Sequence, residues 1–481
     1  MTDSFTGPNG LFIDGGFRHA SDGAVFPVED PATGKTITDV ANASVSDGLA
    51  AAEAARKALA PWGACTPRQR AEVLRSAFEL LTAHRDEIAD LIIAENGKAR
   101  SDALAEADYA AEFFRWFSEE AVRLPGSLRE SPTGNRRIME ISQPVGVVLA
   151  ITPWNLPAAM ITRKVAPALA AGCTVIVKPS NQTPLTALRI AELLTQAGVP
   201  NGAVNIVPTR RDKEVVAALI DSSPVQMLSF TGSTQVGRQL LAQASGRVLN
   251  TGMELGGNAP FIIFEDADID KAVEAAMTAK MRHNAEACTA ANRFYVHDAI
   301  REEFTAKFVQ AMEALRLGPG QDEGTEVGPL ASKAALEGLQ DAVASALQAG
   351  AQRATRTDIP DGPGYYFPPT VLTNVAPDAA ILNHELFGPV APVVGFTDED
   401  HVVTMANATD MGLGSYVFSA DLARALRVAE RVHAGMVGVN TGIFSDPAAP
   451  FGGVKQSGIG REGGHHGIHE FLETKYIAVQ W

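Results

Sequence analysis

The sequence predicts an α/β protein built on a parallel β-sheet with helices covering both of its faces. After Pro144, apolar segments of strand length alternate with helical segments, starting with the uninterrupted apolar run Val145–Ile151. Strands that are apolar on both faces are typical of a parallel sheet enclosed between helices. At 481 residues the chain is longer than one hydrophobic core usually supports, so we expect two or three domains.

The N-terminal third is expected to be mainly helical. Thr66–Gln69 is a capping box with proline at the first helical position, and apolar residues recur at helical spacing over Leu74–Ile92. Gly97 supplies the signal for a helix to end. A second helix is expected over Ser101–Arg123, and the polar, turn-rich segment Ser131–Ser142 indicates a hairpin that projects from the main body.

The alternating region predicts the order of its own elements. After the first strand we expect a helix over Leu156–Ala171, a strand over Thr174–Val177, a helix over Leu185–Ala197, a strand over Val204–Val207, a helix over Lys213–Ile220, a strand over Met227–Phe230 and a helix from Ser233. Strands and helices continue after Pro260, which indicates a second α/β unit.

Composition and charge exclude several classes of protein. The 40 basic and 56 acidic residues leave a net charge of −16, which disfavours binding to nucleic acid or anionic lipid. No apolar stretch reaches the ~20 residues of a membrane span, and the opening MTDSFTGPNG lacks the basic and apolar parts of a signal peptide. Three cysteines cannot form a disulfide framework in a chain this long. We therefore expect a cytoplasmic protein with reduced thiols and no membrane or nucleic-acid partner.

Common nucleotide and metal motifs are present only as incomplete matches. The glycines of Gly458–Gly463 match GxGxxG, but too little chain follows them to complete a βαβ dinucleotide unit. Gly232–Gly237 has the spacing of a P-loop without its Lys-Ser/Thr ending. The histidines of His465–His469 have no acidic partner at a metal-site spacing, so we expect a solvated C-terminal segment and no metal.

Several local patterns place reactive side chains at element ends. Gly232 lies where a predicted strand meets a predicted helix, a position that suits a pyrophosphate, and Lys178 lies at the end of another strand. Asn155 lies between a strand and a helix, where its amide could donate to an oxyanion. Glu254 precedes paired glycines, and Cys288 follows an amphipathic helix. Each pattern alone is equally compatible with an ordinary structural role.

Taken together, these patterns resemble one family. The segments TPWNLP, KPSNQTP, FTGSTQVG, MELGGN, EACTAANR, ELFGP and PFGGVKQSGIGRE occur in the order and spacing of the aldehyde dehydrogenase superfamily, over about Ile13–Tyr476. The resemblance implies a doubly wound NAD(P)-binding domain (residues 1–124 and 146–256) and an α/β catalytic domain (257–446). It also implies a small β oligomerisation element (125–145 and 462–481), hence a homodimer or homotetramer.

The resemblance also implies roles for individual residues. Cys288 matches the nucleophile, Asn155 the oxyanion donor and Glu254 the base that activates water. The positions that match the coenzyme site are Trp154, Lys178, Ser180, Asn181, Gly232, Ser233, Glu385 and Phe387. Since Asn181 lacks the negative charge that would repel a 2′-phosphate, both NAD and NADP are admissible.

Within the superfamily the chain is most similar to succinate-semialdehyde dehydrogenases. Arg163, Arg282 and Ser445 match the carboxylate-binding positions of that subfamily, and two guanidinium groups with a hydroxyl can hold the far carboxylate of a short ω-oxo acid. Glutarate semialdehyde, which differs by one methylene, and a general aldehyde substrate remain alternatives. A non-catalytic protein on the same scaffold remains the alternative from another class.

The segment that leads to Cys288 departs from the family pattern. His283, Ala285 and Glu286 replace the Asn, Gly and Gln that the family usually has there. Glu286 would raise the pKa of the thiol if its carboxylate pointed inward, and would have no effect if it pointed away. Ala290 stands where some members of the subfamily carry a second cysteine, so we expect no redox disulfide at this site.

Overall fold

The computed structural model describes residues 5–480; Met1–Ser4, where the segment examined for a signal peptide begins, and Trp481 lie outside the described residues. The helices are α1 (Val45–Ala64), α2 (Pro67–Ala83), α3 (Arg85–Asn96), α4 (Arg100–Glu120), α5 (Ala159–Ala171), α6 (Pro184–Gln196), α7 (Asp212–Asp221), α8 (Thr234–Ser245), α9 (Ile269–Met281), α10 (Arg301–Glu313), α11 (Lys333–Gln348), α12 (Glu399–Asn407) and α13 (Leu422–Arg431).

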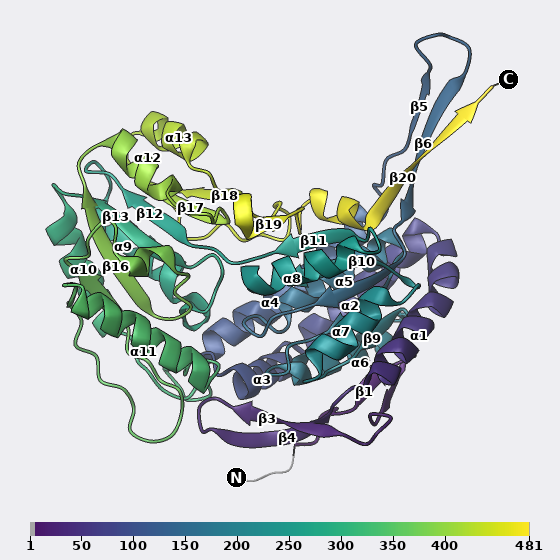
Figure 1. The fold of residues 1–481 in the computed structure, drawn as a ribbon, viewed down its shortest axis with the longest axis horizontal. Coiled ribbons are helices and arrows are strands. Elements are labelled where there is room, and N and C mark those ends of the chain that lie inside the picture. The colour runs from purple at the N-terminus through teal and green to yellow at the C-terminus, as the bar shows by residue number, and fades with distance from the viewer. Residues whose placement is uncertain (1–4, 481) are drawn as a thin grey trace.

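The strands fall into four sheets (Figure 1). They are β1 (Leu11–Ile13), β2 (Gly16–Arg18), β3 (Val25–Asp30), β4 (Lys35–Ala41), β5 (Ser127–Glu130), β6 (Arg137–Pro144), β7 (Val147–Ile151), β8 (Thr174–Lys178), β9 (Val204–Ile206), β10 (Val225–Thr231), β11 (Asn250–Glu254), β12 (Ala259–Ile263), β13 (Ala291–His297), β14 (Gln352–Arg353), β15 (Thr370–Thr373), β16 (Val390–Phe396), β17 (Gly414–Phe418), β18 (Met436–Val439), β19 (Gly458–Ile459) and β20 (Leu472–Val479).

The first large sheet has the order β19-β11-β10-β7-β8-β9-β1-β2, and β11 to β9 in that order are mutually parallel. Alternate residues of β7 face opposite helical layers. Val148 and Ala150 pack in one core with α2, α4, α5 and α6, whereas Val147 and Leu149 pack in another with α1, α7 and α8. Every residue of β7 is buried. The expected sheet with both faces covered is confirmed.

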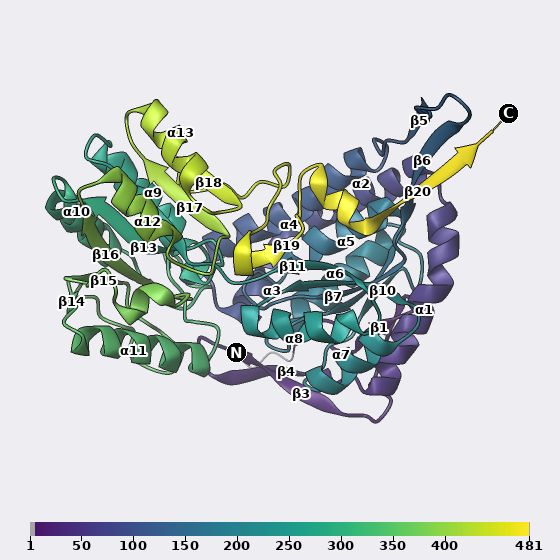
Figure 2. The ribbon, with the colours of Figure 1, turned by 45° about the horizontal axis from the view of Figure 1, so that its top comes forward.

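The second large sheet, β14-β15-β16-β13-β12-β17-β18, is parallel except at the edge strand β14. On β12, Ile262 faces a core shared with α11, α12 and α13, while Phe261 and Ile263 face α9 and α10. Figure 2 shows this sheet with its helices on one side of the molecule and the first sheet on the other, with α4, β11 and β19 between them.

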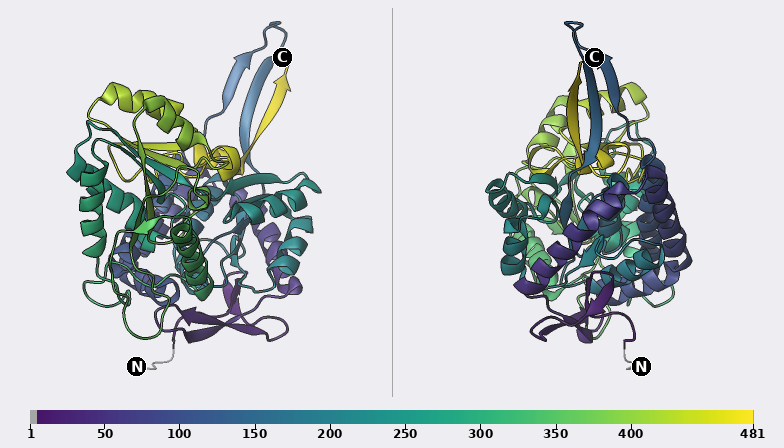
Figure 3. Two further views of the ribbon diagram at one scale, coloured as in Figure 1. Left: turned by 60° about the vertical axis from the view of Figure 1, so that its left-hand side comes forward. Right: turned by 90° about the vertical axis from the view of Figure 1, so that its right-hand side faces the viewer.

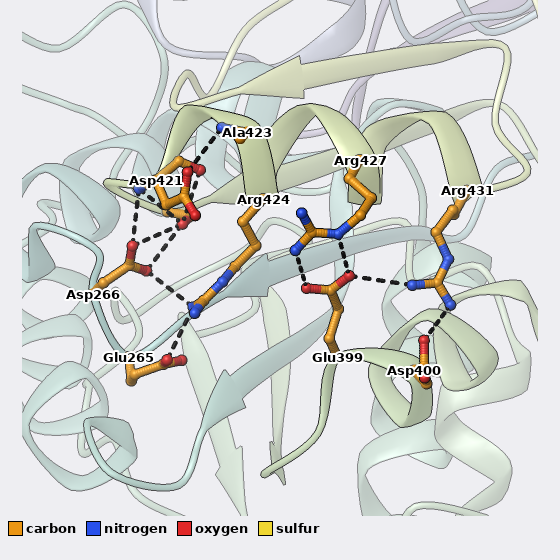
Figure 4. Close-up of polar contacts among 10 residues, drawn as sticks. Glu265, Asp266, Glu399, Asp400, Asp421, Ala423, Arg424, Arg427 and Arg431 are labelled. Carbon is orange, nitrogen blue, oxygen red and sulfur yellow. Dashed lines mark hydrogen bonds and ion pairs between the residues drawn. The ribbon is translucent and has the colours of Figure 1, made fainter.

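Ion pairs join the outermost helices of the second sheet (Figure 4). Arg424 on α13 lies 3.4 Å from Asp266, and Arg427 and Arg431 lie 2.7 and 3.2 Å from the carboxylate of Glu399 on α12. These side chains are partly exposed to solvent, and ion pairs at the surface contribute little individually. They therefore align α13 over a layer whose stability comes mainly from the apolar residues beneath it.

A three-stranded antiparallel sheet, β20-β6-β5, projects from the main body and carries the C-terminal strand (Figure 3). Strand β6 pairs with β20 from Leu472 opposite Pro144 to Val479 opposite Arg137. The predicted projecting hairpin is thereby confirmed. The C-terminal strand β20 is paired on one side within its own chain.

Local signals predicted most helix ends in the N-terminal part. The Thr66–Gln69 capping box is formed, and Gly97 ends α3 with φ of 87°. The helical spacing over Leu74–Ile92 is divided at His84, which ends α2 and begins α3. Helix α5 begins later than expected because Leu156 precedes a proline, and residues before proline disfavour helical geometry. No helix of the described residues is long and apolar enough to cross a membrane.

Candidate active site

Cys288 lies where two cavities meet. One has a volume of about 200 Å³ and is lined by Arg163, Arg282, Ser445 and Cys288 among others; we call it the arginine cavity. The other has a volume of about 250 Å³ and includes Gly232, Gly256 and again Cys288 in its lining; we call it the glycine cavity. A thiol at the shared wall can react with a molecule in the first cavity while a second molecule occupies the other.

The segment before Cys288 has an unusual backbone. His283, Asn284 and Ala285 have φ of 55°, 58° and 60°, three successive left-handed residues without a glycine. Asn284 fixes the turn, because its side chain accepts from Gly328 N at 2.8 Å and donates to Pro329 O at 3.1 Å. The left-handed geometry at Ala285 explains why a glycine suits this position in the family pattern that the sequence resembles.

Glu286 points away from the thiol. Its carboxylate Oε1 accepts the backbone N–H of Ala331 at 3.0 Å, and burial raises the pKa of Glu286 to about 8. Burial also raises the pKa of the Cys288 thiol to about 12, and the carboxylates that add to this effect are Glu385 and Glu254. The substituted residue of the lead-in is thus not among the groups that raise the pKa of the thiol.

The backbone around Cys288 is held from both sides. Tyr416 Oη donates to the carbonyl oxygen of Thr289 at 2.9 Å. A Cβ on Gly257 would come within 2.2 Å of the Cys288 carbonyl oxygen, so only glycine fits there without moving the nucleophile.

Asn155 reaches the same place from the end of β7. Its side-chain Nδ2 donates to the backbone carbonyl of Glu286 at 2.9 Å, and its backbone carbonyl oxygen accepts from Lys98 Nζ at 2.7 Å. An amide nitrogen carries two hydrogens, and the residue lines the glycine cavity together with Cys288. The arrangement fixes the amide orientation and leaves one N–H for an oxyanion beside the sulfur.

Glu254, at the end of β11, is not among the residues that line either cavity. It is buried, and its Oε2 has no hydrogen-bond partner. Burial and the neighbouring Glu462 raise the pKa of Glu254 well above its usual range, and the cations that oppose this are Lys164, Arg163 and Arg461. A buried carboxylate with one free oxygen and a raised pKa is suited to take a proton from water.

The two arginines of the arginine cavity are held differently. Arg163 is only 2% exposed; its guanidinium donates to Tyr109 Oη at 2.8 Å and lies 4.1 Å from the centre of the Phe451 ring. Among the described residues Arg282 has no hydrogen-bond or ion-pair partner, although it lines the same cavity. Because Arg163 is buried, it is not part of an ordinary surface ion pair. With Ser445 on the wall, the cavity offers two cations and a hydroxyl to an anionic ligand.

The glycine cavity gathers five of the eight residues matched to a coenzyme site. They are Trp154, Gly232, Ser233, Glu385 and Phe387. Lys178, the last residue of β8, and Ser180 and Asn181 just after the strand lie outside the lining of this cavity. Lys178 forms a 2.5 Å ion pair with Asp212. The roles assigned to these three residues therefore remain predictions.

The residues of the glycine cavity fit a dinucleotide. Ser233 caps α8, and the N-terminus of this twelve-residue helix opens at the cavity, where free N–H groups suit a phosphate. Thr231, on the same wall, has a buried Oγ1 without a partner. Glu385 Oε1 accepts from Gly257 N at 2.9 Å, and a Cβ on Gly256 would lie 2.6 Å from Oε2, so the carboxylate packs closely against this glycine pair.

Sequence reasoning missed three contributors. Tyr109 and Phe451 hold Arg163, and Glu462 forms a 2.5 Å ion pair with Lys164 while lying 3.7 Å from Arg163. Phe451 and Glu462 both belong to the PFGGVKQSGIGRE segment, and this segment was the sequence pattern that could have identified them as site residues. Gly458 and Ile459 of that segment form strand β19, which pairs with β11, and they do not open a βαβ unit.

The C-terminal histidines His465, His466 and His469 are exposed, as expected for a solvated segment, although they also make contacts within the chain. His465 Nδ1 lies 2.6 Å from Glu120 Oε2, and the Nε2 atoms of His465 and His469 are 3.2 Å apart. Among the described residues no group of three or more metal-ligating side chains is placed to hold a metal ion.

Comparison with known proteins defines the class. The family model "Aldehyde dehydrogenase family" matches residues 17–477, and the chain belongs to this family. It is 51% identical over 443 residues to a succinate-semialdehyde dehydrogenase of Paenarthrobacter nicotinovorans, covering 92% of this chain and 98% of that one. It is 44% identical to a succinate-semialdehyde dehydrogenase [NADP(+)] of Escherichia coli K12 and to a glutarate-semialdehyde dehydrogenase of Pseudomonas putida, covering 97% of each chain in both cases.

Solved structures agree in fold. Succinate-semialdehyde dehydrogenase from Burkholderia pseudomallei superimposes with a TM-score of 0.97 at 43% identity, covering 100% of both chains. Betaine aldehyde dehydrogenase from Staphylococcus aureus, solved in complex with NAD+, has a TM-score of 0.95 at 33% identity, covering 99% of this chain and 95% of that chain. The α/β architecture expected from the sequence is confirmed.

Proposed function

We propose that the protein oxidises succinate semialdehyde to succinate with NAD⁺ or NADP⁺. The observation that carries the proposal is that Arg163, Arg282 and Ser445 line the same cavity as Cys288. Two guanidinium groups and a hydroxyl suit a carboxylate, and the small cavity favours a short chain between this carboxylate and the aldehyde carbon. The names of the similar succinate-semialdehyde dehydrogenases support the same substrate.

The reaction divides between the cavities. The thiolate of Cys288 adds through its sulfur to the aldehyde carbon, and the amide of Asn155 with the Cys288 backbone N–H stabilises the resulting oxyanion. When bound in the glycine cavity, NAD(P)⁺ would supply the acceptor for the hydride that leaves this carbon, which then remains bound to Cys288 as a thioester. Glu254 then takes a proton from water, which attacks the thioester carbon, releases succinate and leaves the Cys288 sulfur free.

The coenzyme assignment rests on the glycine cavity. The N-terminus of α8 would hold the pyrophosphate, Glu385 would accept hydrogen bonds from ribose hydroxyls, and Trp154 and Phe387, whose ring centres are 5.6 Å apart, would form the wall. Lys178 and Asn181 are proposed to act at the adenosine ribose. Asn181 carries no charge to repel a 2′-phosphate, so either coenzyme is accepted.

Glutarate semialdehyde is the second candidate, favoured by the similarity to the Pseudomonas putida enzyme. One methylene in a short cavity changes the activation free energy by ~1–3 kcal/mol, so one compound is expected to be preferred without excluding the other.

The test is coenzyme reduction by the purified protein, with succinate semialdehyde, glutarate semialdehyde and propanal offered separately with NAD⁺ and NADP⁺. We expect the highest kcat/KM for succinate semialdehyde, and a large loss in Arg282→Leu for the two carboxylated aldehydes only. Equal turnover of propanal would make the protein a general aldehyde dehydrogenase. Absence of reduction with every pair would favour a non-catalytic protein on this scaffold.

We further propose that the chain is cytoplasmic and forms a homodimer or homotetramer through the projecting sheet of β5, β6 and β20. Leu128 and Tyr476 on this sheet are 65% and 54% exposed, and β20 keeps one edge free within the chain. Light scattering of the intact protein and of a Tyr476→Lys variant tests this; an unchanged mass in the variant together with a monomeric wild type would reject it.

A further inference from the structure

Lys280 is a completely buried lysine at the end of α9, with 0% of its surface exposed. Its Nζ donates to Asn292 Oδ1 at 2.9 Å and lies 3.3 Å from the carbonyl oxygen of Leu386. Both acceptors are neutral. A buried ammonium is costly unless a charge compensates it, so the question is which negative group this lysine serves.

Within the part of the chain that the structure describes, the charged group that stabilises the ammonium is Glu385, which neighbours Leu386 in the chain. Burial lowers the pKa of Lys280 to about 7, and Glu385 opposes this effect. Burial raises the pKa of Glu385 to about 7, opposed by the Gly257 N–H and by Lys280. Two titratable groups thus interact electrostatically with Glu385: Lys280, which lowers the pKa of Glu385, and the Cys288 thiol, whose pKa Glu385 raises.

Lys280 also joins the three segments that surround the nucleophile. It lies two residues before Arg282 at the start of the lead-in to Cys288, its partner Asn292 lies on β13 just after Cys288, and its partner Leu386 lies between Glu385 and Phe387. The last two residues line the glycine cavity. One ammonium group therefore connects the arginine side of the site to the coenzyme side.

We propose that Lys280 is a positioning residue for the coenzyme: its ammonium keeps Glu385 ionised and anchors the Glu385–Phe387 loop, so that Glu385 can accept hydrogen bonds from ribose hydroxyls. This inference rests on the proposed coenzyme role of the glycine cavity. An ionised carboxylate accepts with both oxygens, whereas a protonated one has lost part of this capacity. Removing the cation leaves the Gly257 N–H as the remaining group that opposes the effect of burial on Glu385, so the pKa of Glu385 rises further.

The experiment measures equilibrium binding of NADH and NADPH by fluorescence between pH 6 and 9, without aldehyde. The variants are Lys280→Met, Lys280→Gln, Glu385→Gln and the double variant Lys280→Met/Glu385→Gln. Lys271→Met is the matched control, because Lys271 lies on the same helix with its side chain 79% exposed. Thermal unfolding of each variant accompanies the titrations.

In the wild type we expect affinity to fall as pH drops through the pKa of Glu385, and this acid limb to be absent in Glu385→Gln. In Lys280→Met and Lys280→Gln this fall in coenzyme affinity should begin about one pH unit higher. At a pH within the falling part of the curve, affinity should be about tenfold lower than in the wild type, and it should recover at high pH. Lys271→Met should match the wild type. In the Glu385→Gln background, Lys280→Met should have no further effect on affinity.

A loss of affinity that is equal at every pH, or that persists in the Glu385→Gln background, would show that Lys280 serves packing only and would overturn the proposal. The proposal would also be overturned if coenzyme affinity of the wild type did not fall at low pH. This result does not depend on whether a lysine variant folds. A wild type that binds neither coenzyme would instead reject the proposed function itself. The two failures are therefore distinguishable.

Discussion

The two cavities that meet at Cys288 are built by different means. The arginine cavity depends on a few charged and aromatic side chains, Arg163 and Arg282 above all, that come from separate helices and loops. The glycine cavity depends on strand ends, the start of α8 and glycines that permit close approach of the backbone. Selectivity for the aldehyde should therefore change with single side chains, whereas coenzyme binding is a property of the fold.

The largest effect is expected at Cys288, the reactive residue that lines both cavities. Cys288→Ser replaces the sulfur by a poor nucleophile and should lower kcat at least about 1,000-fold with any aldehyde. Coenzyme affinity, measured by fluorescence titration, should stay within about twofold of the wild type. Substantial turnover in this variant would remove Cys288 from the mechanism.

Glu254 serves the step after hydride transfer, so its loss should separate the two half-reactions. In Glu254→Gln we expect one rapid equivalent of reduced coenzyme per subunit, followed by steady turnover about 10²–10⁴-fold slower than in the wild type. Stopped-flow absorbance measures both phases. A variant without the rapid phase would place Glu254 before hydride transfer.

The pH dependence of this step has a defined sign. Because burial and Glu462 raise the pKa of Glu254, the base becomes ionised only as pH rises through this raised value. The steady rate of the wild type should therefore increase with pH across that range, and the slope should disappear in Glu254→Gln.

The arginines test whether the first cavity recognises charge. Among the described residues Arg282 has no hydrogen-bond or ion-pair partner. Arg282→Leu should therefore lower kcat/KM for succinate semialdehyde about 10- to 150-fold, the range for a hydrogen bond to a charged group, and leave propanal unchanged. The unfolding temperature should change little. Arg163→Leu should lower the same kcat/KM and also the unfolding temperature, since it leaves Glu462 and Tyr109 without this partner. Equal losses for propanal would contradict a carboxylate site.

The smallest effect is expected from the backbone of the second cavity. Gly256→Ala would press on Glu385 Oε2, a group that can shift, so we expect about 1 kcal/mol, or about fivefold weaker coenzyme binding, with unchanged preference among aldehydes. Gly338→Ala is the control, because a Cβ there meets no atom within 4 Å. A change of aldehyde preference in Gly256→Ala would undermine the separation of the two cavities.

Local physical signals predicted most of the fold. The uninterrupted apolar run of β7 predicted a strand buried on both faces, and the capping box at Thr66 predicted the start of α2. The pairing of β6 with β20 could not be predicted in this way, because it joins segments that are more than 300 residues apart and neither periodicity nor turn chemistry encodes such a partner.

The site was predictable in its identities and only partly in its arrangement. Resemblance selected Arg163, Arg282 and Ser445, and the structure brings all three to the cavity of Cys288. The aromatic support of Arg163 and the ion pair of Lys164 with Glu462, 298 residues apart, depend on tertiary packing. The orientation of Glu286, which the sequence left open, depends on the N–H of Ala331 in a distant loop.

The aromatic surroundings of Arg163 have a consequence for solution conditions. Its guanidinium is already stripped of water and held between rings in the free protein, so a carboxylate meets a dehydrated cation with little freedom left to lose. Salt screens exposed charges far more than buried ones. Recognition of the anionic aldehyde through Arg163 should thus be largely insensitive to ionic strength, although the chain as a whole carries a charge of −16.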